Sequence, residues 1–228
     1  EAIQPLAGKV PLILSHNGAN PRLFRRIGPP PYLPFRLIYA GTFGRVNHLD
    51  FLLEVAKYLL PWRGIEVWLL GDGSERPRLE AVASHLSNLR FFSPVSLEEL
   101  PYWLSQCHIG VSTVLPVRSL STNAASKFYH YLANGLVVGL NYGGWQAEVL
   151  SAYHCGFSAE EPSLFAEKVL YYYFHRSLWW ESQARGRLIA EQLFDQMEIG
   201  QQLLEKIRTF AGDVRAGVVT ASAAGGGV

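Results

Sequence analysis

A lysine and a pair of glycines stand where a phosphate-binding site would use them. Lys127 opens a helix-like stretch, and Gly143 and Gly144 follow the strand-like stretch that comes next. The first turn of a helix presents unpaired amides and partial positive charge, so a lysine there is favoured when an anion binds to it. Two glycines after a strand let the backbone approach a ligand closely. This pattern favours a bound diphosphate, with a solvated lysine and an ordinary turn as the alternatives.

The loop "GTFGRVN" at residues 41–47 is a second candidate for phosphate binding, because a strand precedes it and a helix follows it. Its GxxGxxN spacing differs from the GxGxxG of dinucleotide-binding folds, and no GKS or GKT makes it a P-loop. Arg45 could hold the diphosphate from the side opposite Lys127, unless it is an ordinary exposed arginine. The loop is therefore predicted to be a phosphate cradle without a dinucleotide fingerprint.

Two further loops leave strand-like stretches: "GDGSE" at residues 71–75 and "PVRSLSTNAAS" at residues 116–126. The second supplies hydroxyl groups, Asn123 and the start of a helix, and is the favoured floor for the diphosphate. In an open parallel sheet the carboxyl ends of the strands meet at one edge, where ligands bind. Neither a DxD nor an HxH pattern is present to hold a cation. The sequence predicts a phosphate site made of amides and cationic side chains, with no metal.

Alternating strands and helices are expected to position these loops. From Phe35 on, the apolar runs "FRLIYA", "IEVWLL", "LRFF", "HIGVSTVL" and "LVVGL" alternate with longer amphipathic stretches. Such alternation predicts an α/β fold with a Rossmann-like parallel sheet and helices on both of its faces. Further C-terminal helices are expected after Arg176, with a break near Gly186 or Gly200.

The same pattern divides the chain into four parts. We expect an interdomain linker and a first strand, "PLILSH", within residues 1–34, and the Rossmann-like domain at residues 35–176. C-terminal helices should occupy residues 177–211, and the small residues of 212–228 are expected to be disordered. The first residue is Glu1 rather than Met, which suggests a piece of a longer polypeptide.

Composition restricts the class of protein and its surroundings. Of the 228 residues 49% are apolar, and 20 basic side chains balance 19 acidic ones, so the chain should fold without binding nucleic acid. Cys107 and Cys155 form no CxxC pair, which disfavours a disulfide framework or a zinc site and fits a reducing compartment. No apolar run reaches the roughly 20 residues of a membrane span. We expect a cytoplasmic protein, with peripheral contact to the inner membrane face through the aromatic run "YYYFHRSLWW" as a minor option.

Taken in order, several stretches resemble the C-terminal, donor-binding domain of GT-B glycosyltransferases of family 4. "NGANPRLF" resembles the linker of that family, "YAGTFGRVNHLDFLLEVAKYL" its first strand, glycine loop and helix, and "VWLLGDGSERPRL" its GDG turn. "SKFYHYLANGLVVGLNYGGWQAEVL" resembles the KFFDxLAxGKPVxxNYGGWQ segment of the branch that transfers fucosamine-type sugars in O-antigen and capsule synthesis. The resemblance covers residues 15–210, and it is specific as an ordered set although each motif alone is weak.

This resemblance implies transfer of a sugar with retention of its anomeric configuration and without a metal or cofactor. The donor would be a nucleotide-diphosphate sugar, with a UDP-sugar favoured. The acceptor would be a glycan or a polyprenyl-linked molecule, held by an N-terminal acceptor domain in the same or another chain. Lys127 and Arg45 would be the catalytic residues, because they would stabilise charge on the leaving diphosphate. The donor would contact Gly41, Thr42, Gly44, Asn47, Gly71, Pro94, Val95, Thr122, Asn123, Ser126, His130, Gly143, Gly144 and Glu148.

The sequence also departs from the family. His130 stands where an acidic residue should hold the ribose hydroxyls, and Thr122 stands where many relatives have the first glutamate of a paired motif. A neutral imidazole accepts one hydrogen bond and cannot make the two-oxygen contact of a carboxylate. Thr42 and Asn47 stand where most of the family has an arginine and a lysine, although the O-antigen branch tolerates this pattern.

These departures leave two other functions open. One is a noncatalytic or degenerate nucleotide-sugar-binding subunit that needs a partner chain with the acceptor domain. The other is a sugar-nucleotide epimerase or a Rossmann oxidoreductase. The oxidoreductase is disfavoured because the glycine spacing is wrong and the strand "IEVWLL" does not end in an acidic residue.

Overall fold

A parallel sheet forms the centre of the protein in a computed structural model that describes residues 13, 15–117 and 124–215. Its six strands are β1 (Phe35–Ala40), β2 (Ile65–Leu70), β3 (Leu89–Phe92), β4 (Ile109–Ser112), β5 (Val137–Leu140) and β6 (Gly156–Ser158). They lie in the order β3-β2-β1-β4-β5-β6, and every neighbouring pair is parallel. The predicted Rossmann-like α/β fold is confirmed. The order reverses between β1 and β4, which is where ligands bind in sheets of this kind.

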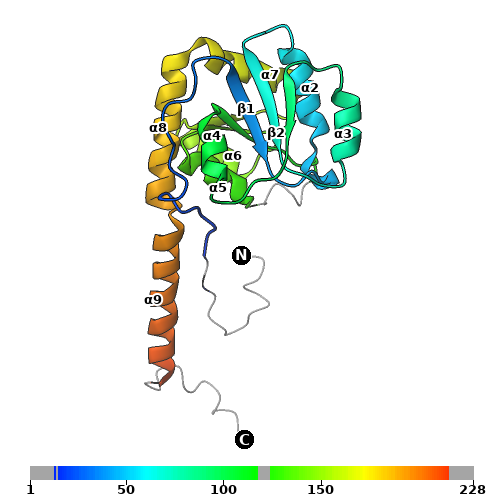
Figure 1. Cartoon of the computed structure of the whole chain (residues 1–228). Helices are drawn as coiled ribbons and strands as arrows, with labels where there is room; N and C mark the ends of the chain where they lie inside the picture. The colour runs from blue at the N-terminus through cyan, green and yellow to red at the C-terminus, as the bar shows by residue number, and fades with distance from the viewer. Residues whose placement is uncertain (1–12, 14, 118–123, 216–228) are drawn as a thin grey trace, which may run out of the picture.

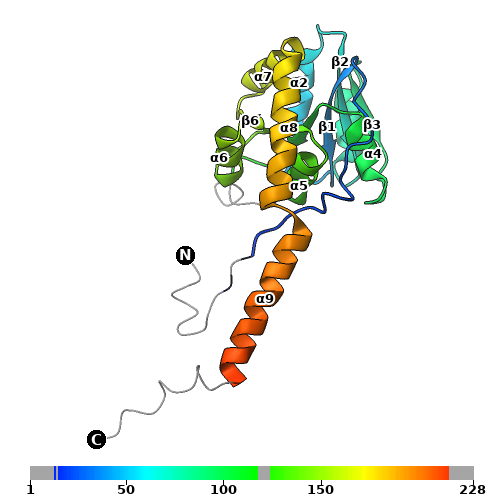
Figure 2. The ribbon, with the colours of Figure 1, turned by 90° about the vertical axis from the view of Figure 1, so that its left-hand side faces the viewer.

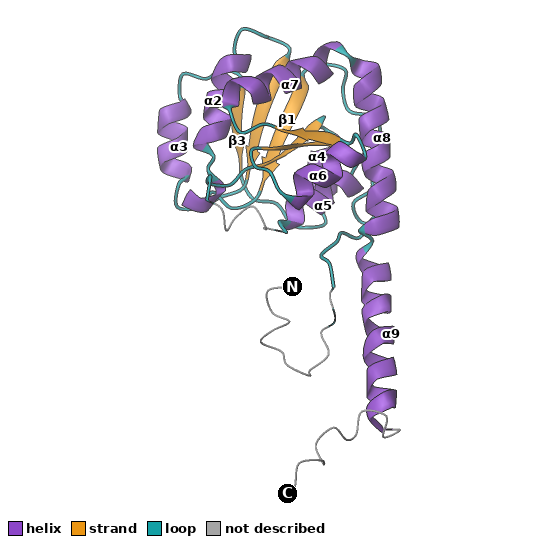
Figure 3. Cartoon of the chain, turned by 180° about the vertical axis from the view of Figure 1, so that it is seen from behind, coloured by secondary structure: helices purple, strands orange, loops and turns teal. Residues whose placement is uncertain are grey.

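Helices cover both faces of the sheet, as Figures 1 and 3 show. They are α2 (Asp50–Leu59), α3 (Arg76–Ala83), α4 (Leu100–Ser105), α5 (Ser126–Ala133), α6 (Trp145–Ala152), α7 (Pro162–Phe174), α8 (Arg176–Leu193) and α9 (Gln196–Arg215), with a short 3-10 helix, η1 (Arg45–Asn47). The side chains of β1 alternate between two cores. Phe35, Leu37 and Tyr39 pack with α2 and α7, whereas Ile38 packs with α5 and α8. Both faces are therefore apolar, as expected for a sheet buried on both sides.

Close packing of α5 against the sheet fixes the position of its first turn. A side chain at Gly110 of β4 would overlap the ring of Tyr131, so only glycine lets α5 come this near. The hydroxyl of Tyr131 accepts a hydrogen bond from the backbone N–H of Ala40, at the end of β1, with a distance of 2.9 Å. The end of β1 and the start of α5 are thereby held side by side.

The segment before β1 lies against the domain and is fixed there by two arginines. Arg26 donates hydrogen bonds to the carbonyl oxygens of Ser105, Cys107 and Gly135. Arg187 of α8 donates to the carbonyl oxygens of Pro21, Phe24 and Ala133. The only regular pairing among the described residues of this segment is a bridge between Ala19 and Asp195. Of the predicted strand "PLILSH", residues 11, 12 and 14 lie outside the described residues, and Ile13, Ser15 and His16 are not part of a strand.

The C-terminal helices differ from the prediction in where they break. The break falls at Phe194 and Asp195, whereas Gly186 lies inside α8 and Gly200 inside α9. A side chain at Gly186 would lie 3.1 Å from Leu132, so this glycine serves helix packing rather than chain reversal. The carboxylate of Asp195 accepts the N–H of Met197 and starts a new helix.

Helix α9 extends away from the domain (Figure 2) and runs to Arg215, past the boundary predicted at residue 211. None of the described helices is both long and apolar enough to cross a bilayer.

Candidate functional site

A pocket of about 510 Å³ opens at the carboxyl ends of β1, β2 and β3, beside the first turn of α5. Eight residues that the sequence singled out line it: Gly41, Thr42, Gly71, Pro94, Val95, Ser126, Lys127 and His130. The sequence analysis did not select Ala40, Leu70, Asp72, Leu100 and Ala125, which also line it. Ala40 and Leu70 are the last residues of β1 and β2, and this position was the signal that could have found them. The volume is within the range of small-molecule sites.

The two glycine loops that form one wall of the pocket are joined through their backbones. The N–H of Phe43 donates to the carbonyl oxygen of Asp72 at 2.7 Å, and the N–H of Glu75 donates to the carbonyl oxygen of Phe43 at 3.0 Å. Gly71 has a φ of 148°, and a side chain there would overlap the carbonyl oxygen of Gly41. The glycine at position 71 is thus required by contact between the loops, whether or not a ligand is bound.

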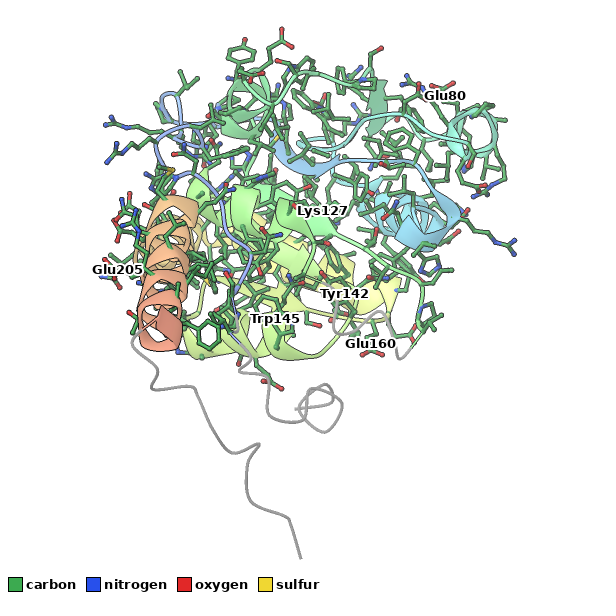
Figure 4. The ribbon with its side chains drawn as sticks, turned by 90° about the horizontal axis from the view of Figure 1, so that it is seen from below. Glu80, Lys127, Tyr142, Trp145, Glu160 and Glu205 are labelled. Atoms are coloured by element: carbon green, nitrogen blue, oxygen red, sulfur yellow. The ribbon has the colours of Figure 1, made fainter. Side chains whose placement is uncertain are left out.

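Lys127 lies near the middle of the carboxyl edge of the sheet (Figure 4), in the first turn of α5. Its ammonium stands 4.8 Å from the ring centre of Tyr39. A side chain at Gly41 would lie 3.3 Å from Cε of Lys127, so the lysine lies across the glycine loop. Within the described residues no carboxylate pairs with it, and burial lowers its pKa from 10.5 to about 8. An anion in the pocket would compensate this unpaired charge.

His130, one turn after Lys127, stacks on Phe24 of the N-terminal segment. Their ring centres are 4.0 Å apart and the rings are nearly parallel, with 8° between their planes. Burial and, to a smaller degree, the charge of Lys127 lower the pKa of His130 to about 4, so the imidazole is neutral at pH 7. A neutral, stacked imidazole can give a ligand one polar contact from its edge.

Arg45, predicted to hold the diphosphate, and Gly44 do not line this pocket. They line a separate depression with Asp50 and Arg78, which form a bidentate ion pair at 2.7 and 2.8 Å. The chain turns away at η1, and His48 follows it with a positive φ of 47°. Asn47 has a structural role, because its amide donates to the carbonyl oxygen of Thr42 at 2.8 Å.

Gly143, Gly144 and Glu148 of the "NYGGWQ" segment, which the sequence analysis selected, do not line this pocket. Gly144 has a φ of 90° and caps α6, which requires glycine. The side-chain amide of Asn141 makes two 2.9 Å hydrogen bonds with the backbone of Val114, two residues after the end of β4.

Next to it, the hydroxyl of Tyr142, labelled with Trp145 in Figure 4, donates to the side-chain oxygen of Gln146 at 2.7 Å. These polar side chains fix the loops after β4 and β5. Two predicted ligand contacts, Thr122 and Asn123, lie outside the described residues. In the described ranges, 13, 15–117 and 124–215, no group of three potential metal-binding side chains occurs.

Comparison with known proteins identifies a family and a fold. The model of a family described as "Glycosyl transferases group 1" matches residues 34–173. HepE of Anabaena, solved in complex with UDP-glucose, has a TM-score of 0.71 and 16% identity over 86% of this chain and 57% of HepE. Sucrose-phosphate synthase of Thermosynechococcus elongatus has a TM-score of 0.73 and 16% identity over 92% of this chain and 55% of the synthase.

WaaG, a glycosyltransferase involved in lipopolysaccharide biosynthesis, has a TM-score of 0.67 and 16% identity over 83% of this chain and 55% of WaaG. A comparison with curated proteins finds no match. This chain spans little more than half the length of these three solved proteins. At this identity the likeness establishes the fold, which is that of a GT-B C-terminal domain.

Proposed function

Because this chain belongs to the family described as glycosyl transferases group 1, we propose that its pocket binds the nucleotide-diphosphate sugar of a sugar-transfer reaction. The observation that carries the proposal is Lys127, an ammonium without a carboxylate partner among the described residues, at the start of a helix on the ligand-binding edge of the sheet. The UDP-glucose complex of HepE, which has the same fold, supports a UDP-sugar as the donor.

In this proposal Lys127 and the helix amides of α5 neutralise the charge that develops on the leaving diphosphate. The backbone of Gly41 and Thr42 lies opposite Lys127 and completes the phosphate site. Pro94 and Val95, after β3, receive the base, and the edge of His130 contacts the ribose. We assign Arg45 no part in this site, because it lines another depression.

We further propose a retaining, metal-independent reaction of the family 4 type, in O-antigen or capsule synthesis. The acceptor is a glycan or a polyprenyl-linked molecule, bound by an acceptor domain outside residues 15–215. The ordered motifs described above support this assignment. We place the protein in the cytoplasm, in peripheral contact with the inner face of the membrane.

Calorimetric titration with UDP, UMP and UDP-glucose tests the donor site. A second phosphate beside Lys127 adds a charged hydrogen bond of about 1.5 to 3 kcal/mol, so UDP should bind roughly 10 to 150 times more tightly than UMP. Equal affinity for UDP and UMP, or no binding of any of the three, would refute the proposed donor site.

A noncatalytic subunit is the second candidate, favoured by the neutral His130 in place of a carboxylate. The variant His130→Glu should then bind UDP several-fold more tightly, while a deoxyribose analogue gains nothing. Transfer or hydrolysis of UDP-glucose by the unmodified chain would exclude this candidate. Membership of the glycosyltransferase family disfavours the epimerase and oxidoreductase alternatives.

A further inference from the structure

Exposed aromatic side chains gather at the end of the sheet opposite the pocket. Here the amino end of β1, the loop before β2 and the junction of α7 and α8 meet, at the top of Figure 1. Tyr32 is 76% exposed, Leu33 50%, Trp62 38% and Phe174 57%. We call these four side chains the aromatic cap. Large exposed apolar side chains in one place mark an interaction surface.

Two members of the aromatic cap are in direct contact, and the other two lie nearby on the same end of the sheet. The rings of Trp62 and Phe174 lie 5.2 Å apart, edge to face. The ring centres of Tyr173 and Phe174 are 5.1 Å apart. A Cβ atom placed at Gly64 would lie 2.7 Å from the hydroxyl of Tyr173 and 3.2 Å from Cδ2 of Leu33. Tyr173, Gly64 and Arg176 thus bring together the three separated segments of the chain that carry the cap.

Cations accompany the aromatic cap. The guanidinium of Arg176 lies over the ring of Tyr32 at 5.1 Å and donates a hydrogen bond to the carbonyl oxygen of that residue. Arg63, next to Trp62, is exposed and forms no ion pair with any described residue. Arg176 is half-buried among the rings of Tyr32, Phe35 and Tyr173, so Arg63 is the exposed cation of this surface.

The segments that build the cap contain no acidic residue. Residues 25–36, 57–65 and 168–180 include neither Asp nor Glu, although the whole chain has 19 acidic residues. The nearby Glu66 is held in ion pairs by Arg36 and Arg90, and Glu54 pairs with Lys57. The end of the domain thus combines aromatic side chains with uncompensated positive charge. This combination matches the interface of an anionic bilayer, where aromatic rings lie among the headgroups and arginines meet phosphate.

We propose that the aromatic cap docks this domain on an anionic lipid surface. This inference deepens the proposed peripheral location, and its test uses no nucleotide, so it can fail independently of the donor site. The pocket lies at the other end of the sheet and stays open to water when the cap is in the membrane. Helix α9 also carries exposed apolar side chains, Leu204, Ile207 and Phe210, and provides the internal control.

The test is vesicle flotation of the 228-residue chain with phosphatidylcholine vesicles, with and without about 30% phosphatidylglycerol. Binding is expected only to the anionic vesicles and should weaken as salt rises. Arg63→Glu should lower the partition coefficient about 25-fold, from roughly fivefold for each of two charges. Tyr32→Ser with Phe174→Ser should lower it by at least about tenfold.

Two control variants keep the test specific. Arg22→Glu changes an exposed arginine away from the cap, and Leu204→Ser with Ile207→Ser changes the apolar face of α9. Both should bind vesicles as the unmodified chain does, and circular dichroism should show that all variants are folded. No binding to anionic vesicles, or loss with the α9 variant but not with the cap variants, overturns the proposal. A dimer that dissociates in the cap variants would identify a protein interface and also overturn it.

Discussion

Replacing Lys127 by methionine should raise the stability of the free protein and weaken its binding of UDP. The pKa of Lys127 is lowered by burial from 10.5 to about 8. Each unit of that difference corresponds to about 1.4 kcal/mol. Since solvent partly screens this half-buried side chain, the ammonium destabilises the free protein by about 1 to 2 kcal/mol at pH 7.

The direction of the pH dependence follows from that pKa. The folded-state value lies below the unfolded one, so the destabilisation is complete below about pH 8 and disappears as the pH rises toward 10.5. Methionine keeps the length of the side chain without the charge. Lys127→Met should therefore raise the melting temperature at pH 7 by roughly 2 to 8 °C, and the difference should shrink above pH 10.

UDP affinity should change in the opposite sense. Loss of a charged hydrogen bond to phosphate corresponds to about 1.5 to 3 kcal/mol, or a 10- to 150-fold higher Kd. In the unmodified protein UDP binding should weaken up to tenfold per pH unit above pH 8, as the lysine loses its proton. In Lys127→Met the affinity should stay constant over the same range.

Differential scanning fluorimetry and calorimetric titration from pH 7 to 10 measure both effects. Lys168→Met, which changes an exposed lysine of α7, is the matched control and should alter neither quantity. A lower melting temperature for Lys127→Met would mean that this lysine is a structural residue. Unchanged UDP affinity would refute its role in the pocket.

Three further predictions concern the framework of the site. Gly71→Ala should lower the free energy of unfolding in urea by about 3 kcal/mol or more, because the new methyl group overlaps the carbonyl oxygen of the neighbouring loop. Tyr131→Phe should lower it by about 1 kcal/mol, since the partly buried N–H of Ala40 loses its acceptor, and an unchanged urea midpoint would contradict this. Arg187→Ala should release residues 19–26 to trypsin cleavage several-fold faster, as followed by mass spectrometry, while the same change at exposed Arg208 should not.

The sheet could be predicted because strands β1 to β5 are short, mostly apolar runs with at most one charged residue each, and "IEVWLL" forms β2 over its whole length. The same reasoning brought Gly41, Gly71 and Lys127 into one pocket, since the carboxyl ends of parallel strands share an edge. The very short β6 (Gly156–Ser158) has too few residues to show a pattern, and the sequence analysis did not select it.

The path of each loop after its strand could not be predicted from apolar runs and strand ends. Arg45 stands two residues after Phe43, whose buried ring anchors the loop, and the 3-10 turn then carries the arginine to another depression. The turn ends at His48, which has a positive φ, and a positive φ at a histidine could not be predicted from the sequence. Likewise, Gly144 caps a helix where the sequence suggested a ligand, because both roles require the same residue type.

The segment from Ala19 to Arg26, which Arg26 and Arg187 bind to the domain, determines where the preceding chain can change direction relative to the sheet. Its carbonyl groups are bound to α8, and Phe24 is stacked on His130, so these residues move as one piece with the sheet. Any reorientation of polypeptide upstream therefore pivots before Ala19, beside the junction of α8 and α9, where the Ala19 N–H donates to the carbonyl oxygen of Phe194. A hinge at Ala19 would therefore lie near the carboxyl edge of the sheet, which is the edge that carries the pocket.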